Sequence, residues 1–346
     1  MVTVKREGVL LEKTVLGFES AAVFNPAVYQ DGDEVHLFYR AVRRGNFSTI
    51  GYCRLQGALQ VVERSKVPLI IPQYPYERQG VEDPRIVKVD NSYYLSYTAY
   101  DGITALGALA VSEDLRHFDK KGVIVPEVNF RRFSELVQSG MRLNEKYFRE
   151  HREYAAHGLL TAGLNLWDKN VIFFPARIDG NLVFLHRIRP GIQIVSARNI
   201  PDELTTDFWE RYLLNFSDHI VMEPKYPHES SYIGAGCPPL LTDEGWLLIY
   251  HGVYDGPEGY VYHACAALLD RDNPSREIAR LPRPLLSPEE DWEKRGYVNN
   301  VVFPTGTAIF GDRLYIYYGA ADSRIAVASV NLKDLLQELS ASKSFY

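Results

Sequence analysis

The chain has 346 residues, of which 46% are hydrophobic and 12% aromatic, so it can bury a large core. Its formal net charge is −6, and no cluster of Lys and Arg is interleaved with aromatic residues, which excludes nucleic acid as an expected partner. Cys53, Cys237 and Cys265 are too few and too scattered for a disulfide framework or a cysteine zinc site. The first residues carry no apolar leader, and no apolar run reaches the roughly 18 residues of a membrane helix. We therefore expect a cytoplasmic protein with no membrane partner.

Five stretches of the chain repeat one pattern, in which a proline opens a strand, a turn follows, and a second strand ends in a polar residue. The prolines are Pro26, Pro84, Pro175, Pro239 and Pro304, which lie 58, 91, 64 and 65 residues apart. A third strand is expected after most hairpins, over 48–52, 105–111, 192–196, 262–269 and 325–330. Such periods indicate radial repetition, so we predict an all-β, five-bladed β-propeller that forms a single catalytic domain over residues 1–346. The alternative is that proline-hairpin punctuation recurs in any all-β chain.

Three further elements are expected outside the repeats. The segment from Val4 to Phe24 is predicted to supply an outer strand that closes the ring with the last blade, because an open propeller leaves unpaired edges. Residues from about 127 to 166 lengthen one interval and predict a helical insertion between blades two and three. Its apolar residues at roughly helical spacing are Phe133, Leu136, Val137, Met141, Leu143, Tyr147 and Phe148. The amphipathic run Leu332–Leu339 predicts a C-terminal helix packed outside a blade. The insertion is read either as a packing or oligomer element or as a lid.

Polar residues end the second strand of every copy. They are Arg40, Asp101, Arg187, His251 and Asp322. Because equivalent positions of successive blades ring one axis, we expect these side chains to surround one funnel. Asp101 is the main candidate for a general acid, since it lies at a strand end and can be partly desolvated. The alternatives are that Asp101 caps its own Asp-Gly turn, and that Asp83 is a structural carboxylate held by Arg85.

Motifs of other chemistries are missing from the sequence. His228, His251 and His263 form no His-x-x-x-His or Glu-x-x-His pair, so no metal site is predicted. The chain has no Gly-x-Ser-x-Gly elbow, and Gly234-Ala235-Gly236 opens a blade and not a phosphate-binding helix. We therefore predict no cofactor.

Five motifs together carry a resemblance to a known family. They are Gly80–Ile86, Tyr97–Gly102, Ile233–Pro239, Gly245–Val253 and Tyr317–Asp322. Over nearly the whole chain except the insertion, the sequence resembles glycoside hydrolase family 130, whose members are five-bladed propellers that act on β-mannosides as phosphorylases or hydrolases. The resemblance implies that Asp101 is the proton donor, acting through a hydroxyl of the mannosyl unit, and that Asp322 holds that mannose. It also implies a mannose subsite with Arg40, Asn46 and Ser48, beside Asp83 and Arg85.

The phosphate site of the family's phosphorylases is matched in part. Asn170, Arg187, His251 and Tyr262 fall on expected positions. Lys169 stands where an arginine is expected and loses the bidentate fork, while Tyr232 stands where a lysine is expected and loses a charge. One cation fewer in a buried funnel should weaken phosphate binding by ~1–3 kcal/mol. The departure favours water over phosphate as the nucleophile.

The resulting prediction is an inverting enzyme that cleaves short β-mannosides by hydrolysis, with Glu229 as the base that activates water at the funnel mouth. The alternative for Glu229 is that it only orients Arg187 or His251. The first alternative is a phosphorylase that uses inorganic phosphate and releases mannose 1-phosphate. The second is a non-catalytic sugar-binding propeller. The expected partner is a small oligosaccharide, and a homo-oligomer is left open together with the linkage, β-1,2 or β-1,4.

Overall fold

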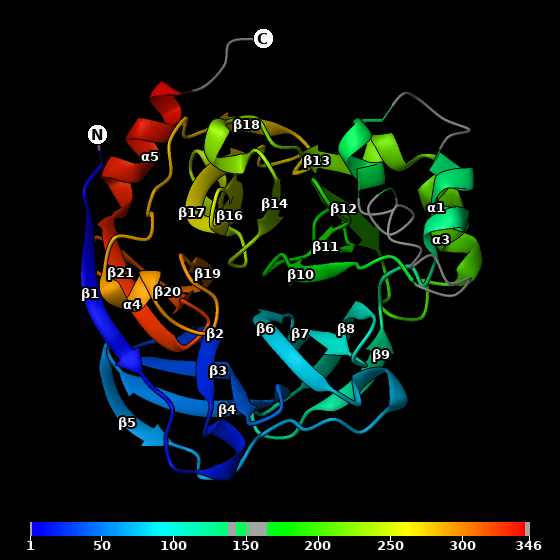
Figure 1. Cartoon of the computed structure of the whole chain (residues 1–346). Coiled ribbons are helices and arrows are strands. Elements are labelled where there is room, and N and C mark those ends of the chain that lie inside the picture. The colour runs from blue at the N-terminus through cyan, green and yellow to red at the C-terminus, as the bar shows by residue number, and fades with distance from the viewer. Residues whose placement is uncertain (1, 138–142, 150–151, 153–164, 343–346) are drawn as a thin grey trace.

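The computed structural model describes residues 2–137, 143–149, 152 and 165–342. Its strands form four sheets, and the largest joins two antiparallel groups through a single parallel pair, Ser48 with Gly80. The chain thus contains five antiparallel units, which Figure 1 shows around a common centre with β2, β6, β10, β14 and β19 nearest to it. The predicted mainly-β architecture is confirmed.

The units follow one another along the chain. The first unit contains β2 (Ala22–Asp31), β3 (Glu34–Arg43), β4 (Phe47–Gln56) and β5 (Gln60–Arg64), and the second contains β6 (Gly80–Val89), β7 (Ser92–Tyr100), β8 (Ala105–Ser112) and β9 (Asp119–Val123). The third contains β10 (Lys169–Phe173), β11 (Leu182–Arg187), β12 (Ile192–Ala197) and β13 (Ile220–Met222). The fourth contains β14 (Tyr232–Ala235), β15 (Leu240–Thr242), β16 (Gly245–Gly256), β17 (Gly259–Leu269) and β18 (Glu277–Arg280). The fifth contains β19 (Val302–Phe310), β20 (Arg313–Ala320), β21 (Arg324–Asn331) and β1 (Val4–Leu11).

The two chain ends behave as predicted. Strand β1 pairs antiparallel with β21, so the N-terminal segment completes the last unit. Helix α5 (Leu332–Ala341) is capped at its N-terminus by Asn331, whose side chain accepts a hydrogen bond from Asp334 N. The helix buries Leu335 and Leu339 against the fourth and fifth units. Its one-sided apolar pattern therefore marks the face that packs.

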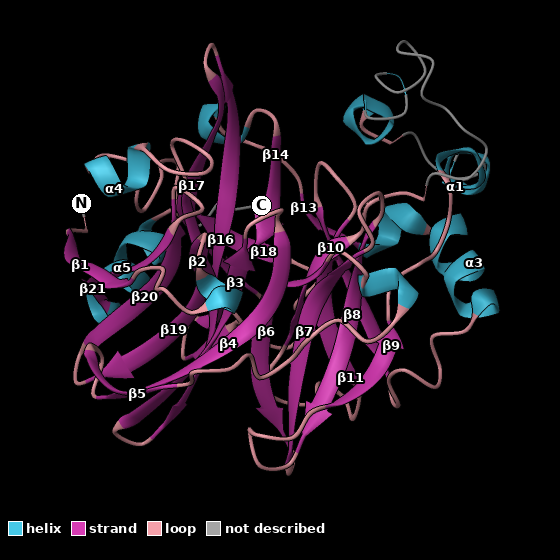
Figure 2. Cartoon of the chain, turned by 60° about the horizontal axis from the view of Figure 1, so that its bottom comes forward, coloured by secondary structure: helices cyan, strands magenta, loops and turns pink. Residues whose placement is uncertain are grey.

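Helices cover the outer side of the third unit. α1 (Phe130–Val137) confirms the first predicted helix of the insertion, and residues Glu145–Phe148 form a 3₁₀ turn, whereas Met141 lies outside the described residues. Helix α3 (Thr206–Leu214), which the repeat pattern did not predict, packs beside α1 (Figure 2). The other short helices within the described ranges are α4 (Asp291–Lys294) and the 3₁₀ turns Gly17–Glu19, Pro75–Glu77, Phe216–His219 and Pro227–Glu229. No helix in the described ranges is long and apolar enough to cross a membrane.

The core lies between neighbouring units and not in one central mass. One apolar cluster joins the third and fourth units through Phe174, Leu185 and Trp246, and comparable clusters fill the other boundaries. The centre of the ring is consequently free to hold polar side chains.

A carboxylate, a tyrosine and a cation form the same buried cluster in four of the units. In the first unit Tyr39 donates to Glu19 at 2.8 Å, and Arg64 pairs with that carboxylate at 3.0 Å. The other three clusters are Glu77 with Tyr97 and Lys120, Glu229 with Tyr250 and Arg280, and Glu293 with Tyr318 and Arg6. All four glutamates are 0% exposed and lie at the end of a short helical turn or, in α4, within one. In each cluster the glutamate, which precedes the inner strand, is thus bonded to a tyrosine of the adjacent strand of the same unit.

Candidate active site

Inner strands of the first three units bulge where they pass the centre. The pairing register shifts between Phe24 and Ala27 in β2, and again at the equivalent places in β6 and β10. Asn25, Asp83 and Asn170 occupy these bulges with φ angles of 50°, 48° and 58°, a left-handed conformation that Asn and Asp tolerate better than other side-chain-bearing residues. A bulge redirects side chains, and here all three line one cavity.

That cavity has a volume of about 120 Å³ and receives side chains from every unit. Its lining residues are Asn25, Arg40, Asp83, Lys169, Asn170, Arg187, Arg189, Tyr232, Tyr262, Val301, Phe303 and Asp322. Four of them are cationic and two are carboxylates. Eight of the residues predicted for the site are therefore brought together in one place.

Carboxylates, Arg40 and Asn25 form one connected group of side chains at the cavity. Arg40 donates to Glu82 at 2.6 Å and to Ser48 at 2.9 Å, and Asn25 donates to Asp83 at 2.8 Å. Although burial opposes it, the Arg40 guanidinium and the Lys169 ammonium lower the pKa of Asp83, which keeps this carboxyl ionised. Burial and the nearby Asp83 charge raise the pKa of Asp322 to about 7. Asp322 can therefore carry a proton near neutral pH, whereas Asp83 cannot.

Cations and aromatic rings form a second group of side chains in the cavity lining. The guanidinium carbons of Arg189 and Arg187 lie 4.0 and 5.0 Å from the centre of the Tyr232 ring, and the Tyr232 and Tyr262 hydroxyls are 2.7 Å apart. Burial, assisted by Arg187, lowers the pKa of Lys169 to about 8. An anion bound here would offset the repulsion among these cations and favour the charged form of Lys169.

His251 and Asn170 lie next to this second group of side chains. His251 is 0% exposed, and burial together with the charge of Arg187 holds its pKa well below the usual range, so it is neutral and its Nε2 accepts from Arg187 Nη1 at 3.3 Å. His251 therefore orients Arg187 from behind the cavity wall. The buried side-chain oxygen of Asn170 has no hydrogen-bond partner among the described residues, which leaves it available to a ligand hydroxyl.

Asp101 lies beside this cavity and does not line it. It follows the last residue of β7, and its Oδ1 accepts from the backbone N–H groups of Ile103 and Thr104 at 2.8 and 2.7 Å, as the turn-capping alternative expects. Trp167 connects this turn to the cavity wall, since its Nε1 donates to Ile103 O at 3.0 Å and its ring centre lies 5.2 Å from Lys169 Nζ. Capping its turn through Oδ1 is compatible with proton donation from Oδ2.

The five polar strand ends are not equivalent positions, contrary to the prediction. The strand registers equate Arg40, Thr98, Arg187, His251 and Gly319, which pair with the inner strands. Asp101 and Asp322 each lie three residues beyond their unit's equivalent position. Arg40, Arg187 and Asp322 do line one cavity, and His251 supports Arg187 from outside it.

The position predicted for Glu229 at the funnel mouth is wrong. Glu229 is fully buried in the fourth unit's carboxylate cluster, where it accepts hydrogen bonds from Tyr250, Arg280 and the backbone N–H of Lys225 and Tyr226. A carboxylate with these partners and no exposure cannot activate a water at the mouth. Glu229 is a structural residue.

Two predicted sugar contacts also lie apart from the cavity. Asn46 is exposed on the β3–β4 turn, where its carbonyl accepts from Gln79 at 3.0 Å. Arg85 is buried and donates to the carbonyl oxygens of Asp83 and Pro84, both at 2.9 Å, so it holds the bulge that carries Asp83. Ser48 is buried beside Arg40, to which its hydroxyl is bonded.

Asn25 and Arg189 line the cavity but were missed from the sequence. Asn25-Pro26 stands at the same place in the first repeat as Asp83-Pro84 in the second, and this correspondence could have identified Asn25. Arg189 lies two residues after Arg187, the spacing that puts two side chains on one face of an extended chain. Arg189 supplies a positive charge to the cavity, and this offsets the charge lost where Tyr232 replaces the expected lysine.

Only one group in the described ranges has side chains close enough to suggest a metal. His228, Glu229 and Cys265 place ligand atoms within 4.8 Å of one another. Glu229 is already bonded to Tyr250 and Arg280, and burial raises the pKa of the Cys265 thiol well above its usual value. The group therefore fits a packed core better than a metal site.

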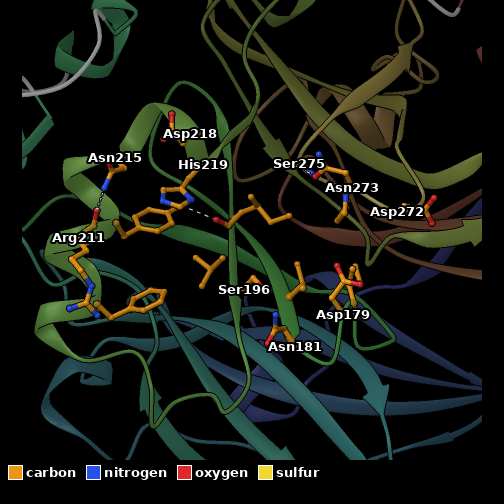
Figure 3. Close-up of a pocket in the computed structure, with 17 residues that line it drawn as sticks. Asp179, Asn181, Ser196, Arg211, Asn215, Asp218, His219, Asp272, Asn273 and Ser275 are labelled. Atoms are coloured by element: carbon orange, nitrogen blue, oxygen red, sulfur yellow. Dashed lines mark hydrogen bonds between the residues drawn. The ribbon is translucent and has the colours of Figure 1, made fainter.

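A second, larger pocket of about 500 Å³ lies on the outer side of the third unit (Figure 3). Asn181, Ser196 and His219 line it together with Asp272 from the neighbouring unit. None of the residues predicted for the active site lines this pocket, so its larger volume does not make it the candidate active site.

Replacing Glu229 with glutamine is expected to lower the free energy of unfolding by about 3 kcal/mol, the lower end for breaking a buried ion pair, and to leave kcat nearly unchanged. Glu77→Gln, in the equivalent cluster of the second unit, is the matched control and should behave in the same way. Denaturant unfolding and kcat of both variants test this. A large loss of kcat in Glu229→Gln alone would restore a catalytic role.

A small polar cavity that combines carboxylates with several cations, at the centre of a ring of sheets, can bind a polar ligand through charge-assisted hydrogen bonds and offers groups for acid-base catalysis, as an enzyme site requires. The chain belongs to glycoside hydrolase family 130: the family model described as beta-1,4-mannooligosaccharide phosphorylase matches residues 9–340. The resemblance found in the motifs is thereby confirmed, as is the prediction of an enzyme.

Two relatives come from Thermoanaerobacter sp. (strain X514). The chain is 34% identical to a 1,2-beta-oligomannan phosphorylase over 97% of its own length and 99% of the relative, and 34% identical to a beta-1,2-mannobiose phosphorylase over 90% and 91%. Among solved structures, the beta-1,2-mannobiose phosphorylase from Listeria innocua, in complex with beta-1,2-mannobiose, aligns with a TM-score of 0.73 at 21% identity, covering 98% of this chain and 99% of that one. A structure from work on family 130 hydrolases that target beta-1,2 mannosidic linkages in Candida mannan aligns at 0.72 and 22% identity, covering 96% and 94%. The solved structures support the fold.

Proposed function

We propose that this chain is a five-bladed β-propeller that cleaves short β-1,2-linked mannosides by phosphorolysis, with inversion, and releases mannose 1-phosphate. The observation that carries the proposal is the group of three cations, Lys169, Arg187 and Arg189, that line one cavity, with both arginines over the Tyr232 ring. Both relatives that are 34% identical over nine-tenths or more of this chain are phosphorylases acting on β-1,2 mannosides. Phosphorolysis was the alternative to hydrolysis in the sequence-based prediction, and these relatives support it better than hydrolysis.

Two features of the cavity argue against water as the preferred nucleophile. Arg189 supplies a cation beside Tyr232, so the inferred charge deficit disappears. Glu229, the only base predicted for water, is buried in the core. A dianion needs cations and no base, and the cavity provides four cationic side chains against two carboxylates.

In this proposal the mannosyl unit lies against Arg40, Asp83 and Asp322, and phosphate lies against Lys169, Arg187 and Arg189. A phosphate oxygen attacks the anomeric carbon from the face opposite the leaving sugar, which inverts the configuration. Asp101 supplies the proton that the leaving oxygen takes up, through a mannosyl hydroxyl, because Trp167 links the Asp101 turn to Lys169 in the cavity wall.

Initial rates with β-1,2-mannobiose should rise from near zero to a plateau as inorganic phosphate is added. The reason is that phosphate is the nucleophile and not an activator. β-1,4-Mannobiose serves as the comparison substrate and should be cleaved more slowly. Equal rates in phosphate-free buffer and in saturating phosphate would refute the proposal.

A further inference from the structure

The third unit departs from the buried cluster that the other four share. At the position of the cluster tyrosine it has His186, one residue before Arg187, just as Tyr39 comes one residue before Arg40. The carboxylate comes from Asp168, directly before β10, and the hydroxyl comes from Tyr212 on helix α3. The third unit, which carries the proposed phosphate contacts, therefore has Asp168, His186 and Tyr212 in place of the glutamate, tyrosine and cation of the other units.

The three side chains form a continuous hydrogen-bonded chain. Asp168 places its two carboxylate oxygens 2.9 and 2.7 Å from His186 Nδ1, and His186 Nε2 lies 2.7 Å from the Tyr212 hydroxyl. The Tyr212 hydroxyl also donates to Ile194 O at 3.2 Å. Asp168 and His186 are both 0% exposed, so no water competes for these bonds.

Neighbouring residues in the chain transmit this arrangement to the cavity. Asp168 directly precedes Lys169 and Asn170, and His186 directly precedes Arg187. Lys169 and Arg187 are paired across β10 and β11, and successive side chains of a strand point to opposite faces. Because Asp168 and His186 are bonded to each other, they also hold the backbone of the neighbouring Lys169 and Arg187, whose side chains line the cavity.

We propose that Asp168, His186 and Tyr212 are positioning residues that set the separation and direction of Lys169 and Arg187, and hence the affinity for phosphate. This inference rests on the proposed phosphorolysis. It also gives α3 a role, because Tyr212 reaches His186 from outside the sheet and lines the pocket of Figure 3. In the other four clusters the tyrosine lies on a strand of the sheet and donates directly to the glutamate, so helix α3 contributes no residue to them.

The test compares Tyr212→Phe with Tyr318→Phe, which removes the corresponding hydroxyl from the cluster of the fifth unit. In Tyr212→Phe the KM for phosphate should rise about tenfold, the lower end of what losing an outer hydrogen-bond partner costs in metal sites, while the KM for the mannoside stays within about twofold. Tyr318→Phe should lower the melting temperature without changing the KM for phosphate. Asp168→Asn, which keeps the size of the side chain, should reproduce the change seen in Tyr212→Phe.

The outcomes separate the inference from the proposed function. If wild-type turnover depends on phosphate but Tyr212→Phe leaves its KM for phosphate unchanged, the positioning role is refuted alone. The same holds if Tyr212→Phe raises both KM values equally, because that result indicates a general structural defect. If the wild type shows no dependence on phosphate, the proposed function fails, and this inference fails with it.

Discussion

Asp101→Asn is expected to lower turnover on the order of 100-fold or more, the usual scale for loss of a general acid. Asparagine keeps an oxygen that can accept from Ile103 N and Thr104 N, so the turn and the stability should be preserved while the proton is lost. Asp83 is a poor substitute, because Arg40 and Lys169 overcome its burial and lower its pKa. The loss therefore should not be rescued by the neighbouring carboxylate.

The leaving group provides a second readout for Asp101. In an aryl mannoside with a highly acidic phenol, the phenolate can leave without much proton assistance. The variant should therefore lose far less activity on that substrate than on mannobiose. Steady-state kinetics on both substrates tests the assignment. Retention of most of the activity on mannobiose would transfer the role to Asp322, whose pKa is raised to about 7.

Arg187→Lys is expected to raise the KM for phosphate on the order of 100-fold, because one or two charge-assisted hydrogen bonds of ~1.5–3 kcal/mol each would be lost. A lysine keeps the charge but has no planar fork, and it would lose the orientation that His251 gives to the guanidinium. The KM for the mannoside should change little, since the contacts of Arg187 are with His251 and Tyr232 and not with Arg40 or Asp83. Phosphate saturation curves of the two proteins provide the measurement.

Arg177→Lys is the matched control for this prediction. Arg177 belongs to the same unit but forms an ion pair with Asp90 at 2.9 Å on the surface. Both KM values of the control should equal those of the wild type. A rise in the KM for the mannoside alone, in Arg187→Lys, would place Arg187 in the sugar subsite and contradict the proposed division of the cavity.

Local turn chemistry explains why the sequence predicted the strands well. Asp31-Gly32-Asp33 and Asp90-Asn91 each mark a hairpin turn that the structure contains. The prediction that a proline opens each inner strand is wrong: Pro26, Pro84 and Pro304 lie inside β2, β6 and β19, and Pro175 and Pro239 follow β10 and β14. Helix α3 was missed because it lies in a long connection within the third unit, where the hairpin pattern carries no information. The short fourth strands β5, β9, β13 and β18 have too few residues to show a period of their own.

The site was predicted less completely, since side-chain direction depends on bulges and long-range contacts. Asn25 reaches the cavity because β2 bulges there, which only the correspondence of Asn25-Pro26 with Asp83-Pro84 in the next repeat indicates. Glu229 was misjudged although a signal existed: an aromatic or histidine residue precedes a glutamate at Phe18-Glu19, Tyr76-Glu77, His228-Glu229 and Trp292-Glu293. Four occurrences at one place in the repeat identify a structural carboxylate, and the fold then shows its partners.

The identity of the sugar product tests the central claim most directly. β-1,2-Mannobiose should be incubated with the protein and inorganic phosphate, and the products followed by phosphorus and proton magnetic resonance. Phosphorolysis with inversion predicts one α-mannose 1-phosphate and one free mannose for each mannobiose cleaved, with an equal loss of inorganic phosphate. Two free mannose molecules for each mannobiose, with inorganic phosphate unchanged, would contradict it.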